Sequence, residues 1–194
     1  MPRPAVMEPI RRAGLIEAAI TEIGASGSLD VTVAQIARRA GVSSALAHHY
    51  FGTKTQIFLS VMRHILALYG AEVRRRLGDA PTPRARLDAI LQASFAEENF
   101  RPEVVSAWLS FYVRARTSPE IAALLRIYRR RLRSNLVHAL KPFGAETAGA
   151  RAEGIAAMID GLYLRQGLAE TVGDTAGGLP LVTEYVNLLL EDRR

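Results

Sequence analysis

Apolar residues recur at helical spacing along almost the whole chain, and no segment shows the polar and apolar alternation of a half-buried strand. The first such segment is expected to open near Pro9 and to close before Gly27. Its apolar face consists of Ile16, Ala19, Ile20 and Ile23. The pattern continues to the end of the chain and predicts an all-α protein of about nine helices.

Two short helices are predicted next. Thr32 and Gln35 form a capping box that begins the first, and Ser43 is the expected N-cap of the second. Gly41 lies between them and allows the positive φ of a tight turn. Two short helices joined in this way form a helix-turn-helix unit, whose second helix presents its N-terminal residues to the major groove of DNA.

A capping box at Thr53 begins a longer helix, predicted over 53–77. The sequence GDAPTP at 78–83 then interrupts the helical pattern. We therefore expect a small N-terminal domain followed by a larger helical one. The predicted organisation is a helix-turn-helix DNA-binding domain over 1–52 and a ligand-binding and dimerisation domain over 53–194, with 53–77 as the connecting helix.

Beyond the connecting helix the pattern predicts five more helices. Three of them lie near 87–95, 103–116 and 118–141, the last beginning with a proline at its first position. The other two, about 146–172 and 182–190, are apolar on more than one face. Such helices are buried on more than one side. We therefore expect a homodimer in which these two helices meet their symmetry mates in a four-helix interface.

Composition excludes several classes of protein. The chain of 194 residues contains no cysteine, and its four histidines form no recognisable ligand cluster, so we expect neither disulfides nor a metal site nor a cofactor. The N-terminus lacks the apolar stretch of a signal peptide, and no run approaches the ~18 apolar residues of a membrane span. A cytoplasmic protein is expected. The formal net charge of +6 favours an anionic partner such as nucleic acid.

The helix-turn-helix predicts a set of DNA contacts. Ser43 caps the second helix, so that the unpaired amides of this helix face the phosphate backbone. We expect Ser44, Ala45 and His48 to meet base edges, and the Arg11–Arg12 pair to extend the phosphate contacts. The alternative is a hairpin that only packs within the protein. The residues assigned to DNA contact are Thr32, Ser43, Ser44, Ala45, His48, His49, Tyr50 and Lys54.

The run over 32–57 resembles a known signature. "IA" and "AGVS" are followed by the aromatic pair "YF" and by a lysine three residues after Phe51. In the order of its segments the whole chain resembles the TetR family of repressors, which join a helix-turn-helix domain to a ligand-binding domain. The resemblance implies that Tyr50 and Lys54 contact phosphates and that residues 44–48 contact bases. Each protomer of a dimer supplies one such helix, so the double-stranded operator should be nearly palindromic.

An effector site is predicted in the second domain. Trp108, Phe111 and Tyr112 lie on one face of a helix. Asp160 interrupts an apolar stretch, and Tyr163 follows three residues later. The alternative is that the aromatic stripe simply fills the core of the domain.

A buried carboxylate is costly unless it is paired with a cation. For Asp160 this cation is either an internal arginine such as Arg165 or a ligand. Aromatic faces around one carboxylate suit a quaternary ammonium ion, because each desolvated cation–π contact contributes about 1 to 2 kcal/mol.

Within the TetR family the chain resembles the choline-sensing BetI-type repressors, through "AQIARRAGVS", "HYF", "AWL.F", "RRL.SNL" and "IDGL.LR" in the same order. The resemblance implies choline as effector and control of glycine betaine synthesis or choline uptake, and it adds Glu97 to the site. Tyr112 and Tyr163 stand where tryptophan is expected, and Ser94 and Ala96 replace polar residues. A different hydrophobic or cationic ligand is therefore the alternative.

Other functions find less support in the sequence. The arginine-rich run over 126–136 is expected to be a solvated helix face whose arginines pair with acidic neighbours, rather than a second nucleic-acid surface. Ser43, Ser44, His48 and His49 lie close together, but no acidic residue accompanies them to orient a catalytic histidine. We therefore expect no enzyme. A helical adaptor without DNA binding is the remaining alternative from another class.

Overall fold

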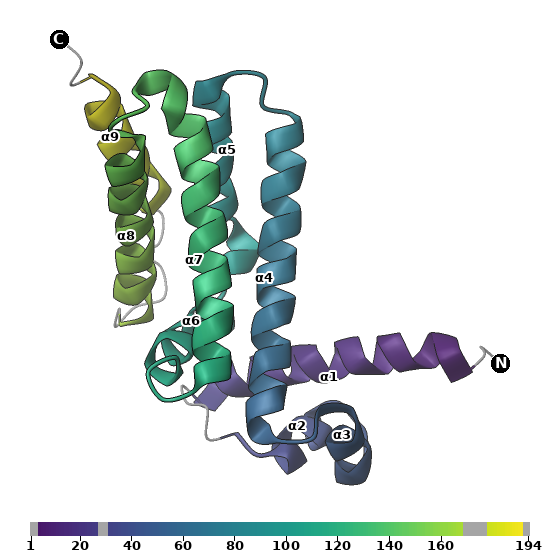
Figure 1. Ribbon diagram of the computed structural model, residues 1–194. Helices are drawn as coiled ribbons and strands as arrows, with labels where there is room; N and C mark the ends of the chain where they lie inside the picture. Colours follow the sequence, from purple (N-terminus) through teal and green to yellow (C-terminus); the bar gives the residue numbers. More distant parts are fainter. Residues whose placement is uncertain (1–3, 27–30, 169–177, 192–194) are drawn as a thin grey trace.

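The computed structural model describes residues 4–26, 31–168 and 178–191. Every regular element in these ranges is helical, with nine α-helices and two short 3-10 helices. This confirms the predicted all-α class. The helices form an upright bundle that stands on a group of three helices near the N-terminus (Figure 1).

The N-terminal group contains the predicted helix-turn-helix. α1 (Pro4–Ser26) crosses the end of the bundle, α2 (Val33–Arg39) packs against it, and α3 (Ser44–Phe51) packs against α2 and the start of α4 (Figure 1). The small core of this group is buried as the sequence predicted. It includes Ile36, Ala37, Ala47 and Phe51, with Ala40 and Val42 partly buried beside them.

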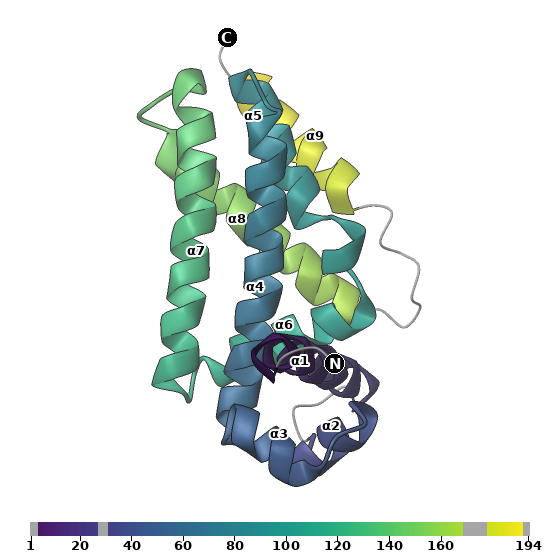
Figure 2. The ribbon, with the colours of Figure 1, turned by 90° about the vertical axis from the view of Figure 1, so that its right-hand side faces the viewer.

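The rest of the chain builds the upright bundle (Figures 1 and 2). Its helices are α4 (Lys54–Gly78), α5 (Pro83–Ser94), α6 (Pro102–Arg114), α7 (Pro119–Leu140), α8 (Ala148–Gly167) and α9 (Gly178–Glu191). The short helices η1 (Glu97–Asn99) and η2 (Lys141–Phe143) follow α5 and α7. α6 is the one that lies low in the bundle, beside α1 (Figure 2).

Local sequence signals fix where most of these helices begin. At Thr32 and at Thr53 the hydroxyl accepts a hydrogen bond from the amide three residues on, and the glutamine there returns one, which completes both predicted capping boxes. Thr82 and Ser118 cap α5 and α7, each followed by a proline at the first turn. The amides that a helix start leaves unpaired are thus satisfied by side chains.

Two helix boundaries differ from the prediction. α1 begins at Pro4 rather than near Pro9, because a proline inside a helix removes one backbone hydrogen bond without always ending the helix. α8 ends at Gly167 rather than near residue 172, and residues 169–177 lie outside the described ranges. Apolar side chains on the last two helices remain exposed in the single chain, among them Leu164, Leu168, Leu181 and Leu188.

The N-terminal group is joined to the bundle where α1 crosses α6. A Cβ atom on Gly24 of α1 would lie 2.6 Å from the Cα atom of Glu103 on α6, so the two backbones are in direct contact. Glu17 adds polar links on the same helix: its carboxylate lies 3.2 Å from His64 Nε2 on α4 and 3.8 Å from Arg101 Nη2 at the start of α6. α1 is therefore held against both α4 and α6.

The crossing predicts a large effect for a small change at Gly24. Gly24→Ala forces α1 and α6 apart, and we expect the free energy of unfolding to fall by about 1–3 kcal/mol. For a domain of this size that corresponds to a Tm loss of about 2–4 °C per kcal/mol. Thermal denaturation followed by circular dichroism measures the change.

Gly14→Ala is the matched control on the same helix. Among the described residues, no atom beyond the adjoining residues and the helix's own backbone lies within 4 Å of the position of its Cβ, so alanine should stabilise the helix by about 0.5–1 kcal/mol. Equal melting temperatures for the two variants would show that the close crossing does not restrict residue 24.

Candidate functional site

The turn between α2 and α3 is formed as the sequence predicted. α2 ends at Arg39 with Ala40 as its C-cap, and Gly41 adopts φ +67°, a conformation that glycine tolerates best. The Val42 amide donates a hydrogen bond to the Ala37 carbonyl at 3.0 Å, which closes the turn. Ser43 then caps α3, since its hydroxyl accepts from the Leu46 amide at 3.2 Å. The start of α3 is therefore set by backbone geometry and one side chain.

The two faces of α3 divide as expected. Ala47 and Phe51 are buried against the rest of the N-terminal group. The exposed side chains of this segment are Ser43, Ser44, Ala45, His48 and His49. Thr32, at the start of α2, is exposed as well. The residues assigned to base edges are thus available to a partner.

His48 has a structural contact that the sequence did not indicate. Its Nδ1 lies 3.3 Å from the carbonyl oxygen of Gly52, which follows the end of α3. Because a carbonyl only accepts, this contact needs the proton on Nδ1, and Nε2 of the neutral ring is then a hydrogen-bond acceptor. The contact orients the ring at the end of α3.

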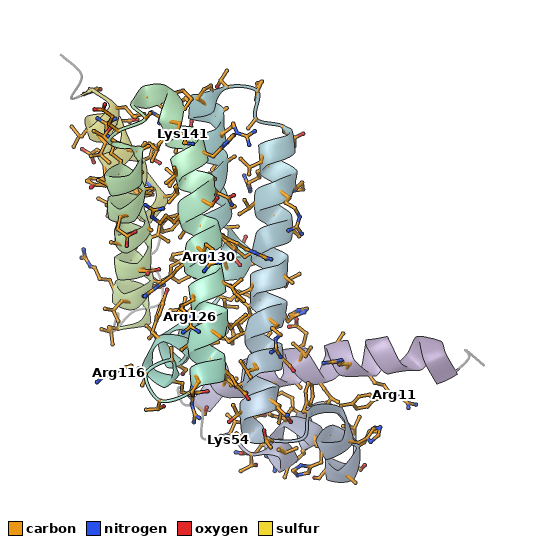
Figure 3. All side chains as sticks on the ribbon, in the orientation of Figure 1. Arg11, Lys54, Arg116, Arg126, Arg130 and Lys141 are labelled. Carbon is orange, nitrogen blue, oxygen red and sulfur yellow. The ribbon has the colours of Figure 1, made fainter. Side chains whose placement is uncertain are left out.

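Three candidate phosphate contacts lie at the same end of the molecule. Tyr50 is half-buried, with its ring 5.7 Å from that of His49. Lys54 is exposed at the first turn of α4. Figure 3 shows Lys54 and Arg11 at the end of the molecule that carries α2 and α3. The structure therefore groups the residues that the sequence assigned to DNA.

The stretch that carries α2, α3 and the start of α4 contains charges of one sign, although Arg39 pairs with Glu22 of α1. Between Val31 and Ala71 the chain contains no aspartate or glutamate. Several basic residues occur in the same stretch, including Arg38, Arg39 and Lys54. A surface of this kind attracts a polyanion and does not repel phosphates locally.

The second candidate site is an aromatic cluster around Trp108. This tryptophan is 4% exposed, and four rings surround it. Their centroids lie at 4.7 Å for Tyr128, 5.6 Å for Phe111, 5.8 Å for Tyr112 and 6.0 Å for Tyr163. The structure thus brings the predicted aromatic residues of α6 and α8 together and adds Tyr128 from α7.

Asp160 lies at the edge of this cluster and has two partners. The Tyr112 hydroxyl donates a hydrogen bond to Oδ1 at 2.8 Å. Arg129 Nη2 lies 3.8 Å from Oδ2, and its guanidinium carbon lies 5.8 Å from the centre of the Tyr112 ring. The cation that Asp160 requires is therefore Arg129 of α7.

Arg165, which the sequence offered as this cation, is exposed and does not pair with Asp160. The two residues are five positions apart on one helix, and at about 100° per residue they lie on different faces. The arginine-rich run instead supplies the partner from a neighbouring helix. Arg133 of the same run lies 3.7 Å from Glu153, so two of its arginines pair with acidic neighbours as predicted.

The ionisation of the cluster follows from its burial. Burial raises the pKa of Asp160, and the hydrogen bond from Tyr112 and the charge of Arg129 oppose this. Burial also raises the pKa of Tyr112, Tyr128 and Tyr163, so these phenols are neutral and can donate hydrogen bonds. The site thus consists of one carboxylate, whose charged form is disfavoured by burial, and several neutral rings.

Ser94 positions two tyrosines, Tyr163 of the cluster and Tyr69 of α4. The Tyr163 hydroxyl donates to the Ser94 carbonyl at 2.6 Å, and the Tyr69 hydroxyl lies 3.2 Å from the Ser94 hydroxyl. Burial raises the pKa of Tyr69 to about 12. The Phe95 and Phe100 rings extend the cluster beside Tyr163. The sequence did not indicate that Tyr69, Phe95 or Phe100 belong to the site, because their approach to Tyr163 and Ser94 depends on how separate helices pack.

Glu97 is not brought into this group. It is exposed on η1, and within the described residues no ion pair or side-chain hydrogen bond joins it to the aromatic cluster. The described part of the chain also contains no group of three or more His, Cys, Asp or Glu residues arranged to hold a metal ion. None of its helices has the length and hydropathy needed to cross a membrane.

The molecule thus combines an exposed second helix of a helix-turn-helix, with basic residues around it, and a helical bundle that holds a buried aromatic cluster with a carboxylate at its edge. This combination defines a ligand-responsive DNA-binding regulator. Comparison with known families agrees: residues 15–61 match "Bacterial regulatory proteins, tetR family", and residues 83–191 match "BetI-type transcriptional repressor, C-terminal". The chain belongs to the TetR family, with a C-terminal domain of the BetI type.

Individual relatives support this assignment. The chain is 51% identical over 185 residues to the HTH-type transcriptional regulator BetI of Brucella suis, which covers 95% of this chain and 93% of that protein. The same regulator of Rhizobium meliloti is 47% identical, with 93% and 90% covered.

Solved structures share the fold. A transcriptional regulator from Pseudomonas aeruginosa PAO1 has a TM-score of 0.77 at 27% identity, covering 95% of this chain and 92% of that one. A regulator from Saccharomonospora viridis, solved in complex with choline, has a TM-score of 0.80 at 20% identity, with 91% and 95% covered.

The raised pKa of Asp160 predicts how its removal changes stability with pH. The folded state binds a proton at Asp160 more tightly than the unfolded chain, so the carboxylate becomes less favourable as pH rises through its folded-state pKa. Asp160→Asn stays neutral and can still accept from Tyr112. We expect this variant to gain stability relative to the parent between about pH 4 and about pH 7.

Urea denaturation of both proteins at the two pH values measures this difference, because unrelated acid effects are common to both. A variant that instead lost relative stability with rising pH would show that the ionised carboxylate stabilises the fold.

Proposed function

We propose that this protein is a choline-responsive repressor that binds a nearly palindromic operator as a homodimer. The observation that carries the proposal is the setting of Asp160. This carboxylate lies at the edge of the aromatic cluster, and the cation paired with it is a largely exposed arginine, Arg129, at 3.8 Å. The role is regulatory rather than enzymatic. Control of glycine betaine synthesis or choline uptake, in the cytoplasm, is the corresponding biological role.

The homodimer is supported by the last two helices. α8 and α9 pack against each other and leave Leu164, Leu168, Leu181 and Leu188 exposed in the single chain. Pairing these helices with their symmetry mates covers these side chains in a four-helix interface. The two α3 helices of such a dimer then face two half-sites, separated by about one helical turn of DNA or a multiple of it.

The chemistry of the aromatic cluster suits a cation without hydrogen-bond donors. Asp160 already accepts a hydrogen bond from Tyr112, so a ligand need supply only positive charge. A quaternary ammonium ion does this, and its methyl groups can lie against the faces of Trp108 and Tyr112. Arg129 occupies the position of that charge in the absence of ligand. We infer that choline replaces Arg129 beside Asp160.

The response to choline runs through α6. This helix carries Trp108 and Tyr112, and it contacts α1 at Glu103. A ligand that shifts α6 therefore changes the position of α1 and of the helix-turn-helix that packs on it. Release of DNA requires that choline bind more tightly to the dimer whose two α3 helices do not match the operator.

Lys54 provides the test of operator binding. With about six cationic phosphate contacts per dimer, log K should fall with log salt at a slope of about −5. Lys54→Ala removes two contacts per dimer, so we expect about tenfold weaker binding and a slope shallower by about 2. Gel shifts of the upstream DNA of the gene at several salt concentrations measure both, and Tyr50→Phe should also weaken binding.

Lys141→Ala is the matched control, because Lys141 lies at the opposite end of the molecule (Figure 3). It should leave the affinity and the slope unchanged. Operator binding without salt dependence, or equal loss in both lysine variants, would contradict the assigned DNA surface.

Choline should release the protein from the same DNA, whereas Asp160→Asn and Trp108→Ala should bind DNA but no longer respond. Gel shifts with choline, betaine aldehyde and glycine betaine measure this response. Indifference to all three compounds would remove choline as the effector and leave the DNA-binding role standing.

Arg129→Ala should bind choline several-fold more tightly, because the competing internal cation is gone. Titration calorimetry measures the affinity. Arg133→Ala is its control, since Arg133 pairs with Glu153 across the same two helices and does not touch Asp160. Weaker choline binding in Arg129→Ala would overturn the exchange of cations.

A further inference from the structure

A groove of about 500 Å³ lies between α4 and α7. The two helices run side by side along the bundle (Figures 1 and 2). Side chains spaced by three or four residues line the groove, from Arg63 to Leu77 on α4 and from Leu124 to Asn135 on α7. Its volume falls within the range of about 300–1,000 Å³ that holds small organic ligands.

Most of the wall of this groove is apolar. Leu66 and Val73 from α4 face Leu124 and Leu132 from α7. Ile127 also lines the groove and is 50% exposed. Val73 and Leu132 are already buried, so an alkyl chain in the groove would shield mainly Leu66, Leu124 and Ile127 from water.

Three arginines line the same groove. Within the described chain, Arg63, Arg74 and Arg131 form neither ion pairs nor side-chain hydrogen bonds, and no acidic side chain lines the groove. The next arginines along α4 differ, since Arg75 and Arg76 both pair with Glu72. Within the described residues, the three arginines of this apolar groove therefore have no acidic side chain paired with them.

Gly70 shapes the middle of the groove. A Cβ atom at this position would lie 3.3 Å from Arg74 Nη1, so the guanidinium folds back over the glycine. No other atom lies within 4 Å of that position. The missing side chain therefore lets the Arg74 guanidinium lie against the glycine, which places a positive charge at the middle of the groove.

We propose that this groove binds the anion of a free, single-chain fatty acid. Arg63 and Arg74 lie about 16 Å apart along α4, so the carboxylate pairs with one or two of the three arginines, and the alkyl chain lies along the leucine, valine and isoleucine side chains. A groove of this size suits one alkyl chain better than the two of a phospholipid. The positive charge excludes choline, so the groove is a separate site from the one at Asp160.

The groove shares two residues with the aromatic cluster. Tyr69 and Tyr128 line it, with ring centroids 6.0 Å apart, and Tyr128 in turn lies 4.7 Å from Trp108. The chain has only one tryptophan. A molecule bound between α4 and α7 therefore lies one ring away from Trp108, whose fluorescence should report its binding.

Titration calorimetry of the full-length protein with dodecanoate, below its micelle concentration, tests the proposal. We expect one dodecanoate per chain, accompanied by a change in Trp108 fluorescence. Gly70→Leu fills the groove and should lower the affinity at least about tenfold, as should the double variant Arg74→Ala/Arg131→Ala. Arg126→Ala is the control, because Arg126 lies on α7 outside the groove lining (Figure 3).

Dodecyltrimethylammonium has the same tail and the opposite charge, but its head group is also of the class proposed for the Asp160 site. It is therefore compared in the Asp160→Asn variant, where it should bind at least tenfold more weakly than dodecanoate. Equal affinity for the two amphiphiles, or dodecanoate binding undiminished in both Gly70→Leu and the double variant, would overturn the site. If Gly70→Leu does not fold by circular dichroism, the double variant decides alone. Either outcome is independent of DNA release by choline, which Asp160→Asn tests separately.

Discussion

The direct contact of α1 and α6 at Gly24 and Glu103 is the constraint on which the rest of the structure depends. Packed helices are stiff, and a crossing without an intervening side chain leaves little room for independent motion. α6 carries Trp108 and Tyr112 a few turns beyond the contact, and α1 supports the helix-turn-helix. Glu17 strengthens the junction, because it links α1 to both α4 and α6. A shift of α6 caused by a ligand would therefore move α1 directly, and with it the helix-turn-helix that packs on α1.

The sequence was sufficient for the parts of the fold that neighbouring residues determine. Thr32 and Thr53 start helices through contacts only three residues long, and Gly41 makes a turn that its own backbone allows. For the same reason the two faces of α3 could be separated in advance, with Ala47 inside and His48 outside. The helix-turn-helix is a local structure, and its candidate DNA contacts were predictable from periodicity together with a family signature.

Contacts between helices were beyond the reach of the sequence, because they depend on how far each helix is rotated and shifted against its neighbour. Spacing placed Trp108 and Tyr112 on one face and flagged Asp160 as needing a cation, but it could not select Arg129 from a run of similar arginines. It also placed Glu97 in the site, whereas the structure leaves this residue exposed on η1. The close approach at Gly24 has no sequence signal of its own.

In the proposed mechanism, the carboxylate that binds the ligand and the residues that bind DNA lie in different parts of the chain. A cation sensor needs a carboxylate, yet a carboxylate near the DNA surface would repel phosphates, and the chain between Val31 and Ala71 has none. Asp160 lies instead on α8 of the helical bundle, where the positive charge of Arg129 compensates its negative charge. Arg129 thus spares Asp160 an unpaired buried charge. In the proposed mechanism choline binding is an exchange of one cation for another, so its affinity reflects the difference between two interactions with Asp160 rather than the full value of one.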